Sequence, residues 1–124
     1  PVDPIVFGNA NGILGPEADV GDLWKTWLPR WRATDPHAIA AGIDAMIERD
    51  DVTDRLGDIH TPALIFHGDA DAGVPFESGV ELATKLPRAE GLIALPGGHH
   101  AAVLSQADRV IGPLQTFLRA HAAG

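Results

Sequence analysis

The amino-acid sequence predicts an α/β fold in which parallel strands are covered by helices on both faces. Two short runs, Ala63–His67 and Leu92–Leu95, are almost continuously apolar, which is typical of buried parallel strands. Residues 75–86, between them, carry apolar side chains at helical spacing, and a further amphipathic segment follows the second run. The order of strand, helix and strand predicts a right-handed βαβ unit.

The N-terminal part of the chain carries weaker signals. Residues 1–20 are rich in Gly, Pro, Asn and Asp and show little periodicity, so they are predicted to form a loop. From Asp22 onward the pattern is helical, with apolar residues at i, i+1, i+4 and i+5, namely Leu23, Trp24, Trp27 and Leu28. Pro29 is expected to end or kink this helix, because proline lacks a backbone N–H and clashes with the preceding turn.

A firm amphipathic helix is predicted over residues 36–49. Asp35 is a favourable N-cap, and Pro36 suits the first helical position. The apolar face has the spacing i, i+4, i+7 and i+8, and consists of Ile39, Ile43, Met46 and Ile47. The acidic pair at residues 50–51 is expected to stop this helix, because negative charge is unfavourable at a helix carboxyl end. A short helical turn is predicted at Thr53–Leu56.

The rest of the chain alternates between strand and helix. After the first strand, Pro75 is expected to open a helix that extends to about Leu86. The second strand is closed by Gly and Pro at residues 96–98. A last helix is predicted over residues 105–121, and its apolar face consists of Val110, Ile111, Leu114, Phe117 and Leu118. Gly112-Pro113 is expected to kink it.

The predicted sheet is too small to be stable alone. Two parallel strands with both faces apolar need further strands beside them, so the chain is expected to contribute to a larger sheet. The chain opens on Pro1 and carries its one methionine at Met46. It is therefore expected either to have lost an initiator methionine or to come from a longer precursor that is cleaved.

Composition and charge narrow the classes of partner. The 124 residues suffice for one domain, and 45% hydrophobic with 21% charged residues is typical of globular proteins. A net charge of −8 argues against nucleic acid and anionic membranes as partners. The absence of cysteine excludes disulfides, thiolate metal sites and a cysteine nucleophile. No signal-peptide pattern or long apolar run is present, so a cytoplasmic location is expected.

Chemically useful side chains follow both predicted strands. Asp69 and Asp71 come after the first strand, and His99 and His100 come after the second. Because functional groups gather beyond the carboxyl ends of parallel strands, the two turns are expected to meet. A carboxylate beside an imidazole fixes its tautomer and stabilises the imidazolium. The aspartate turn is therefore predicted to serve a histidine on the neighbouring turn.

Several assignments remain open at this level. Asp71 could be an ordinary turn or N-cap residue, and Asp69 could be the acid instead, although Asp69 is expected to form the turn by bonding its own backbone. His99 could replace His100. His67 is expected to fix the acid turn, and surface or structural roles are expected for His37, His60 and His121. A metal site is not expected, because adjacent histidines rarely face one ion and no H-E-x-x-H spacing exists.

Residues 50–124 resemble the C-terminal half of an α/β-hydrolase. The acid turn G-x-x-D-x-x-x-P is matched by Gly68, Asp71 and Pro75, and the histidine loop and following helix start by Pro96, Gly97, His100, Gln106 and Asp108. His99 stands where glycine is common. The stretch RDDVTDRLGDIHTPALIFHGDADAGVPF is similar to the esterase and cofactor-free haloperoxidase-like branch. The resemblance implies a doubly wound, mostly parallel sheet over residues 51–124, with residues 1–50 as the remainder of a helical cap.

The resemblance also assigns roles, with Asp71 as the triad acid and His100 as the general base. The family's nucleophile sits on a G-x-S-x-G elbow, which this sequence lacks, since neither Ser78 nor Ser105 has those neighbours. The oxyanion donors are missing with the elbow. The expected protein is thus the C-terminal subunit of a two-chain enzyme, formed by cleavage within the cap. It would hydrolyse an ester, lactone or amide of a small molecule without a cofactor.

The three tryptophans have two possible roles, and two alternative functions are also compatible with the sequence. Trp24, Trp27 and Trp31 lie near one helical face and either join cap to core or line an apolar substrate site. A haloalkane or epoxide hydrolase would use an aspartate nucleophile from the partner chain, which this sequence does not distinguish. A non-catalytic interaction module is the remaining alternative, and the presence of both the acid and the histidine turn argues against it.

Overall fold

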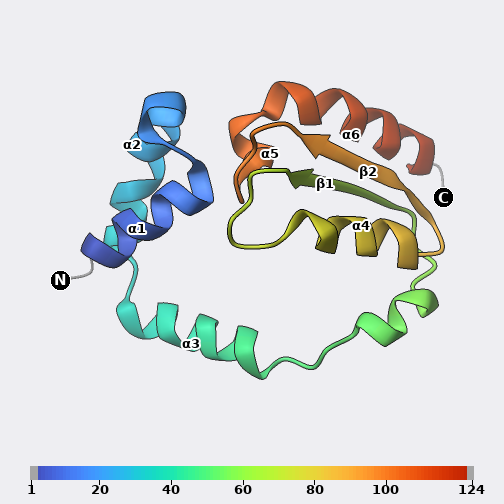
Figure 1. The fold of residues 1–124 in the computed structure, drawn as a ribbon, viewed down its shortest axis with the longest axis horizontal. Helices are drawn as coiled ribbons and strands as arrows, with labels where there is room; N and C mark the ends of the chain where they lie inside the picture. The colour runs from blue at the N-terminus through green and yellow to red at the C-terminus, as the bar shows by residue number, and fades with distance from the viewer. Residues whose placement is uncertain (1–2, 123–124) are drawn as a thin grey trace.

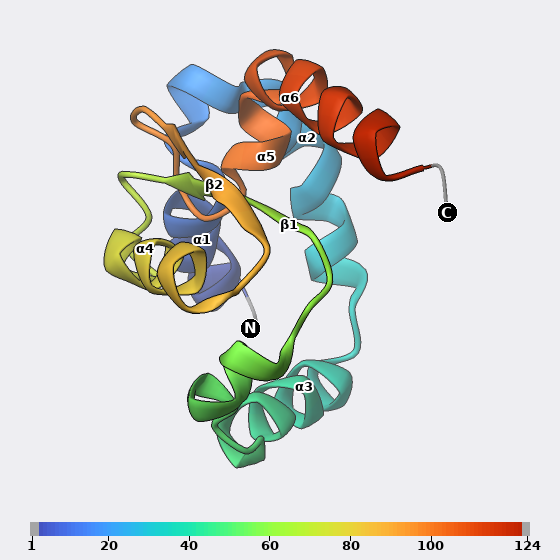
Figure 2. The same ribbon diagram turned by 90° about the vertical axis from the view of Figure 1, so that its right-hand side faces the viewer.

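The computed structural model describes residues 3–122, which form two parallel strands and a set of helices (Figures 1 and 2). In chain order the elements are α1 (Asp3–Leu14), α2 (Glu17–Ala33), α3 (Pro36–Glu48), the 3-10 helix η1 (Thr53–Asp58), β1 (Ala63–Gly68), α4 (Phe76–Lys85), β2 (Ala89–Leu95), α5 (Ala102–Ser105) and α6 (Ala107–His121). Helix α4 covers one face of the strands, and α5 and α6 lie on the other (Figure 1). Within residues 3–122 no helix is long and apolar enough to cross a membrane.

The predicted parallel pairing is confirmed. Strand β1 pairs with β2, with Ile65 opposite Leu92 and Gly68 opposite Leu95. Both strands therefore end at the same level, and the polar turns that follow them start side by side. Strand β2 begins at Ala89, earlier than predicted. The sequence did not predict this part of the strand because Glu90 and Gly91 are exposed and give no apolar pattern. The level strand ends are the feature of the fold that positions the candidate site.

The two turns approach so closely that glycine is required. A Cβ atom on Gly68 would lie 2.2 Å from the carbonyl oxygen of Gly98, a backbone atom that has no freedom to move aside. The backbone N–H of Ala70 donates to that same carbonyl at 3.0 Å. Gly97 has a φ of +65°, in the left-handed region that favours glycine. The Gly-rich composition of both turns therefore has a direct structural cause.

The prediction of a loop over residues 1–20 is wrong for the described part, and residues 1–2 lie outside it. Helix α1 forms despite its glycines and asparagines because one of its faces is buried. Ala10 and Leu14 pack with Trp24 of α2 in a small core between the two helices. The chain then turns at Gly15, which has a φ of +100°. Tertiary contacts thus outweigh weak local propensity.

Helix α2 runs beyond its predicted end. It starts at Glu17 and continues through Pro29 to Ala33, and its one non-helical residue is Val20, with φ −132° and ψ 36°. The sequence predicts that Pro29 ends or kinks the helix, and the predicted end at this residue is wrong. Trp31, beyond the proline, packs against the same cluster as Trp27. This contact stabilises the last turn and offsets the backbone hydrogen bond that proline removes.

The predicted helix over residues 36–49 is confirmed as α3. The Asp35 side chain accepts a hydrogen bond from the His37 backbone N–H at 3.0 Å, and the helix ends before the acidic pair. Its apolar face is uncovered by the rest of residues 3–122, with exposed fractions of Ile39 38%, Ile43 49%, Met46 65% and Ile47 76%. The helix therefore presents a surface typical of a buried interface.

The last predicted helix, over residues 105–121, is confirmed as α6, which begins two residues later at Ala107 and is preceded by a short helix, α5, that the sequence did not predict. Gln106 has φ −123° and ψ 42°, which separates the short α5 from α6, and α6 then runs through Pro113. Val110 is buried against Leu95 and Ala102 in a second small core. Other members of the predicted apolar face stay exposed, namely Ile111, Leu114 and Leu118. The two strands therefore cover only part of the apolar face of α6.

We expect the isolated chain to fold poorly. The described residues bury few large apolar side chains in two separate clusters, while the α3 face and much of α6 stay exposed. Such a molecule lacks the single contiguous core of a stable domain. Circular dichroism and gel filtration of the chain alone should show a broad thermal transition and association. A compact monomer with a sharp transition would contradict this.

Candidate active site

The acid turn follows β1 and is organised around the Asp71 carboxylate. Its Oδ1 accepts hydrogen bonds from the backbone N–H groups of Gly73, at 2.8 Å, and Val74, at 3.0 Å. The side chain is only 5% exposed. Two backbone donors therefore fix the carboxylate plane and leave the other oxygen, Oδ2, to face a different partner.

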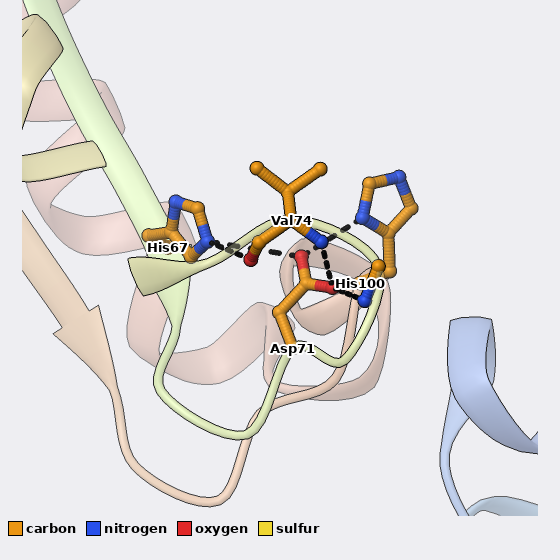
Figure 3. A network of polar contacts seen from close by, with 5 residues as sticks. His67, Asp71, Val74 and His100 are labelled. Atoms are coloured by element: carbon orange, nitrogen blue, oxygen red, sulfur yellow. Dashed lines mark hydrogen bonds and ion pairs between the residues drawn. The ribbon is translucent and has the colours of Figure 1, made fainter. Parts of the chain in front are cut away.

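That partner is His100, whose Nδ1 lies 2.8 Å from Oδ2 of Asp71 (Figure 3). A carboxylate oxygen only accepts, so Nδ1 carries the proton and Nε2 is left with a free lone pair. The imidazole is half exposed, at 50%. Asp71 and His100 thus form an acid–imidazole pair with its basic nitrogen available to a third group.

The environment keeps Asp71 ionised. Burial by itself raises the pKa of Asp71, but hydrogen bonds from Val74, His100 and Gly73 outweigh this and hold it below the ordinary value of 3.8. The charge is therefore fully present at neutral pH. The stability that it contributes is present above the unfolded-state value and is lost only as pH falls through the lower folded-state pKa.

Asp69 has a role that the sequence reasoning missed. Its carboxylate accepts a hydrogen bond from the Gly97 N–H of the histidine turn at 2.6 Å, and its own N–H donates to the Leu95 carbonyl at 3.2 Å. The expectation that Asp69 bonds its own backbone is therefore wrong. The side chain instead ties the acid turn to the neighbouring turn, a non-local contact that spacing along the chain does not reveal.

His99 faces away from Asp71. Its ring lies against Gly15, where a Cβ atom would be 2.8 Å from His99 Cδ2. Its buried Nδ1 has no hydrogen-bond partner among residues 3–122. The adjacent Ala101 N–H donates to the Ile13 carbonyl at 2.7 Å. The histidine turn is thus held by the acid turn on one side and by the α1–α2 corner on the other.

The other histidines are separate from the pair, except His67. His67 Nε2 lies 3.1 Å from the Val74 carbonyl and 3.7 Å from Oδ2 of Asp71. His121 Nε2 lies 2.5 Å from a carboxylate oxygen of Glu90 at the far end of β2. His37 and His60 are exposed. Within residues 3–122 no group of three His, Cys, Asp or Glu side chains could hold a metal ion.

Two cavities meet at His100. One, of about 260 Å³, lies over the strand ends between β1 and α4 and is bordered by Asp71 and Ser78. The other, of about 400 Å³, lies between α1, Met46 and the acid turn, and most of its lining is apolar or glycine. The larger volume lies within the range of small-molecule sites, and the smaller one lies just below that range. The exposed imidazole can therefore reach both spaces.

The three tryptophans lie in or beside the α1–α2 core. Trp24 is buried, and its indole N–H donates to the Gly15 carbonyl at 2.9 Å. Trp27 and Trp31 have ring centroids 6.4 Å apart, and both pack against this core. None of the three borders the two cavities beside His100. Substrate contact by Trp24, Trp27 and Trp31 stays a prediction.

The described residues do not complete a triad. Ser78 lies in the first turns of α4 and borders the smaller cavity, but has no hydrogen bond to His100. The Ser105 hydroxyl donates to the Ala102 carbonyl at 3.5 Å. Neither serine follows a strand in a sharp turn, as a nucleophile elbow does. Among the described residues, the Asp71–His100 pair thus has no serine hydrogen-bonded to it.

Comparisons with known proteins relate the chain to enzymes. The chain is 33% identical over 115 residues to a non-heme haloperoxidase of Rhodococcus erythropolis and 30% identical over 119 residues to the bifunctional esterase/perhydrolase DCH of Acinetobacter calcoaceticus. It is 41% identical over 120 residues to a Synechocystis protein provisionally named a non-heme chloroperoxidase. No family model matches the chain, and no solved structure matches it.

These matches cover nearly all of the chain but only part of each relative. The match to the haloperoxidase covers 92% of the chain and 42% of that protein. For the esterase/perhydrolase the shares are 96% and 41%, and for the Synechocystis protein they are 91% and 40%. The chain thus spans about two fifths of the length of the curated relatives that it matches. Together with its two parallel strands, this shows that the chain is homologous to the C-terminal part of enzymes of the α/β-hydrolase family.

Proposed function

We propose that this chain supplies the acid and the base of a Ser-His-Asp triad in an α/β-hydrolase that cleaves an ester, lactone or amide. The observation that carries the proposal is the 2.8 Å contact between His100 Nδ1 and the buried, ionised carboxylate of Asp71. This arrangement leaves His100 Nε2 free to take a proton from a hydroxyl group. No cofactor is required for this chemistry.

The nucleophile is proposed to come from an N-terminal part on a separate chain. The printed sequence has no G-x-S-x-G elbow, and the two-stranded sheet has room for further strands. In this proposal residues 1–50 are the end of a helical cap and residues 51–124 belong to the core. The cavity of about 260 Å³ beside His100 would receive the serine.

The proposed reaction has two balanced steps. His100 Nε2 takes the serine proton as the serine oxygen attacks the carbonyl carbon, and the imidazolium then protonates the departing alkoxide or amine. In the second step His100 removes a proton from water, whose oxygen attacks the acyl carbon, and the proton returns to the serine. Asp71 stays ionised and stabilises the imidazolium in both steps.

The lining of the larger cavity supports an apolar acyl group as the bound part of the substrate. Ile13, Met46 and Val74 border it, together with His100. A small-molecule ester would place its carbonyl near His100 and its hydrocarbon part in this cavity. The name of the Acinetobacter relative favours a second activity of the same acyl-enzyme, in which hydrogen peroxide replaces water and a peroxyacid is formed.

The two histidines should differ sharply in the assembled enzyme. We expect His100→Ala to lower kcat for a small activated ester by on the order of 10³-fold or more, because the nucleophile loses its base. His99→Ala should retain much of the activity, since His99 faces Gly15 and not Asp71. Steady-state kinetics of the two variants test this, with matched thermal melts. The reverse ranking would contradict the proposed base.

The two aspartates provide an independent test. Asp71→Asn should keep the turn but slow acylation by on the order of 10³-fold, because an amide holds the wrong tautomer and cannot stabilise imidazolium. Asp69→Asn should cost little, since its amide oxygen still accepts from Gly97. The measurement is kcat for the same ester, with melts as the folding control. Equal activity in both variants would remove Asp71 from the mechanism.

The separate-chain proposal predicts a second, different polypeptide in the protein purified from its source. Intact-mass analysis and peptide sequencing should find this chain and a G-x-S-x-G motif within it. A fluorophosphonate probe should label the second chain and leave residues 1–124 unlabelled, because neither Ser78 nor Ser105 is on an elbow. Recovery of one continuous polypeptide, or labelling of Ser78, would contradict this part of the proposal.

A further inference from the structure

A second imidazole lies behind the acid turn. His67 is near the end of β1, and its side chain is 11% exposed. Its Nε2 lies 3.1 Å from the carbonyl oxygen of Val74 and 3.7 Å from Oδ2 of Asp71 (Figure 3). The Asp71 carboxylate is therefore near two imidazoles, His100 on the exposed side and His67 on the buried side.

The Val74 contact determines the tautomer of His67. A carbonyl oxygen only accepts hydrogen bonds, so Nε2 of His67 must carry the proton and donate it. The same nitrogen lies 3.7 Å from Asp71 Oδ2, beyond hydrogen-bond distance, so the donor serves Val74. His67 thus acts as a donor to the acid turn and has no free Nε2 lone pair for catalysis.

Val74 connects the two side chains. Its N–H donates to Oδ1 of Asp71 at 3.0 Å, and its carbonyl accepts from His67 at 3.1 Å. If the His67 donor is lost, the Val74 backbone is held from one side only. The carboxylate that faces His100 would then lose part of its orientation, although neither Asp71 nor His100 has been changed.

The His67 ring is itself held in one place. It contacts Phe76 edge to face, with centroids 5.6 Å apart and planes at 80°. The ring also lies against Gly79 of the same helix, α4, where a Cβ atom would be 2.7 Å from His67 Nδ1. Because the helix offers no side chain at this position, the ring can approach it closely. Such a fixed ring is suited to orienting a neighbouring group.

We propose that His67 is a positioning residue, which orients Asp71 through the Val74 backbone and thereby orients His100. This inference rests on the proposed triad and adds a third side chain to its support. His67 does not touch the reacting atoms in this arrangement. Its loss should therefore affect the chemical step and not substrate binding.

The test compares His67→Leu and His67→Gln in the enzyme assembled with its nucleophile-bearing part. His67→Leu removes the donor, and we expect kcat for a small activated ester to fall roughly 10- to 100-fold with KM nearly unchanged. His67→Gln keeps an N–H donor that can reach Val74, and should restore kcat to within a few-fold of the parent. The His100 Nδ1 proton resonance in NMR spectra should broaden in His67→Leu and persist in His67→Gln.

A second pair of variants avoids changing the histidine. Gly79→Ala would place a methyl group 2.7 Å from the ring nitrogen of His67 and displace the ring, so it should lower kcat in the same way and weaken the His100 Nδ1 proton resonance. The clash opposes the gain in helix propensity, so matched thermal melts accompany the kinetics. Gly112→Ala is the matched control, because it lies in helix α6 and no atom of the described residues is within 4 Å of an added Cβ. It should leave kcat and the proton resonance unchanged.

The outcomes separate this inference from the proposed function. If Asp71→Asn and His100→Ala are inactive while His67→Leu keeps the parent kcat and proton resonance, positioning by His67 is overturned and the triad stands. If Asp71→Asn and His100→Ala are active, the triad fails. The proton resonance then decides by itself whether His67 orients the Asp71–His100 pair.

Discussion

The candidate site depends on the close approach of two backbone turns at the ends of β1 and β2. Gly68 and Gly98 meet with no space for a Cβ atom, and the strand register places Gly68 opposite Leu95. From this point Asp71 and His100 extend toward one another over a few residues each. A side chain at position 68 would separate the turns, and the 2.8 Å contact between carboxylate and imidazole would be lost. The contact between the carboxylate and the imidazole therefore depends first on glycine at the two turns, which allows the backbones to approach.

Neighbouring hydrogen-bond donors keep the Asp71 carboxylate ionised. The protein has a net charge of −8, and the Asp71 carboxylate is nearly buried, yet no Lys or Arg is needed to keep it ionised. Two backbone N–H groups hold one oxygen and His100 holds the other. Such donors are already in place in the folded chain, so in the proposed mechanism the pair would require little reorganisation when the imidazole takes a proton.

Local signals in the sequence predicted much of this arrangement, and non-local contacts account for what they missed. The cap at Asp35, both strands and the juxtaposition of the two turns follow from residue types at short spacing. Helix α1 does not, because its stability comes from the contact of Leu14 with Trp24 and not from its own propensity. The same holds for Asp69, whose partner Gly97 lies 28 residues along the chain.

The orientation of Asp71 and His100 does not depend on the apolar faces that the described residues leave exposed. The hydrogen bonds that orient Asp71 and His100 come from residues between His67 and His100, which are all present. The apolar face of α3 and much of α6 are instead exposed, which is the surface expected where further strands and helices would pack. Adding those elements would bury these faces without replacing any bond within the pair. The proposed triad therefore depends on two separate conditions: the orientation of Asp71 and His100, which residues 67–100 provide, and a nucleophile, which the proposal places on a further chain.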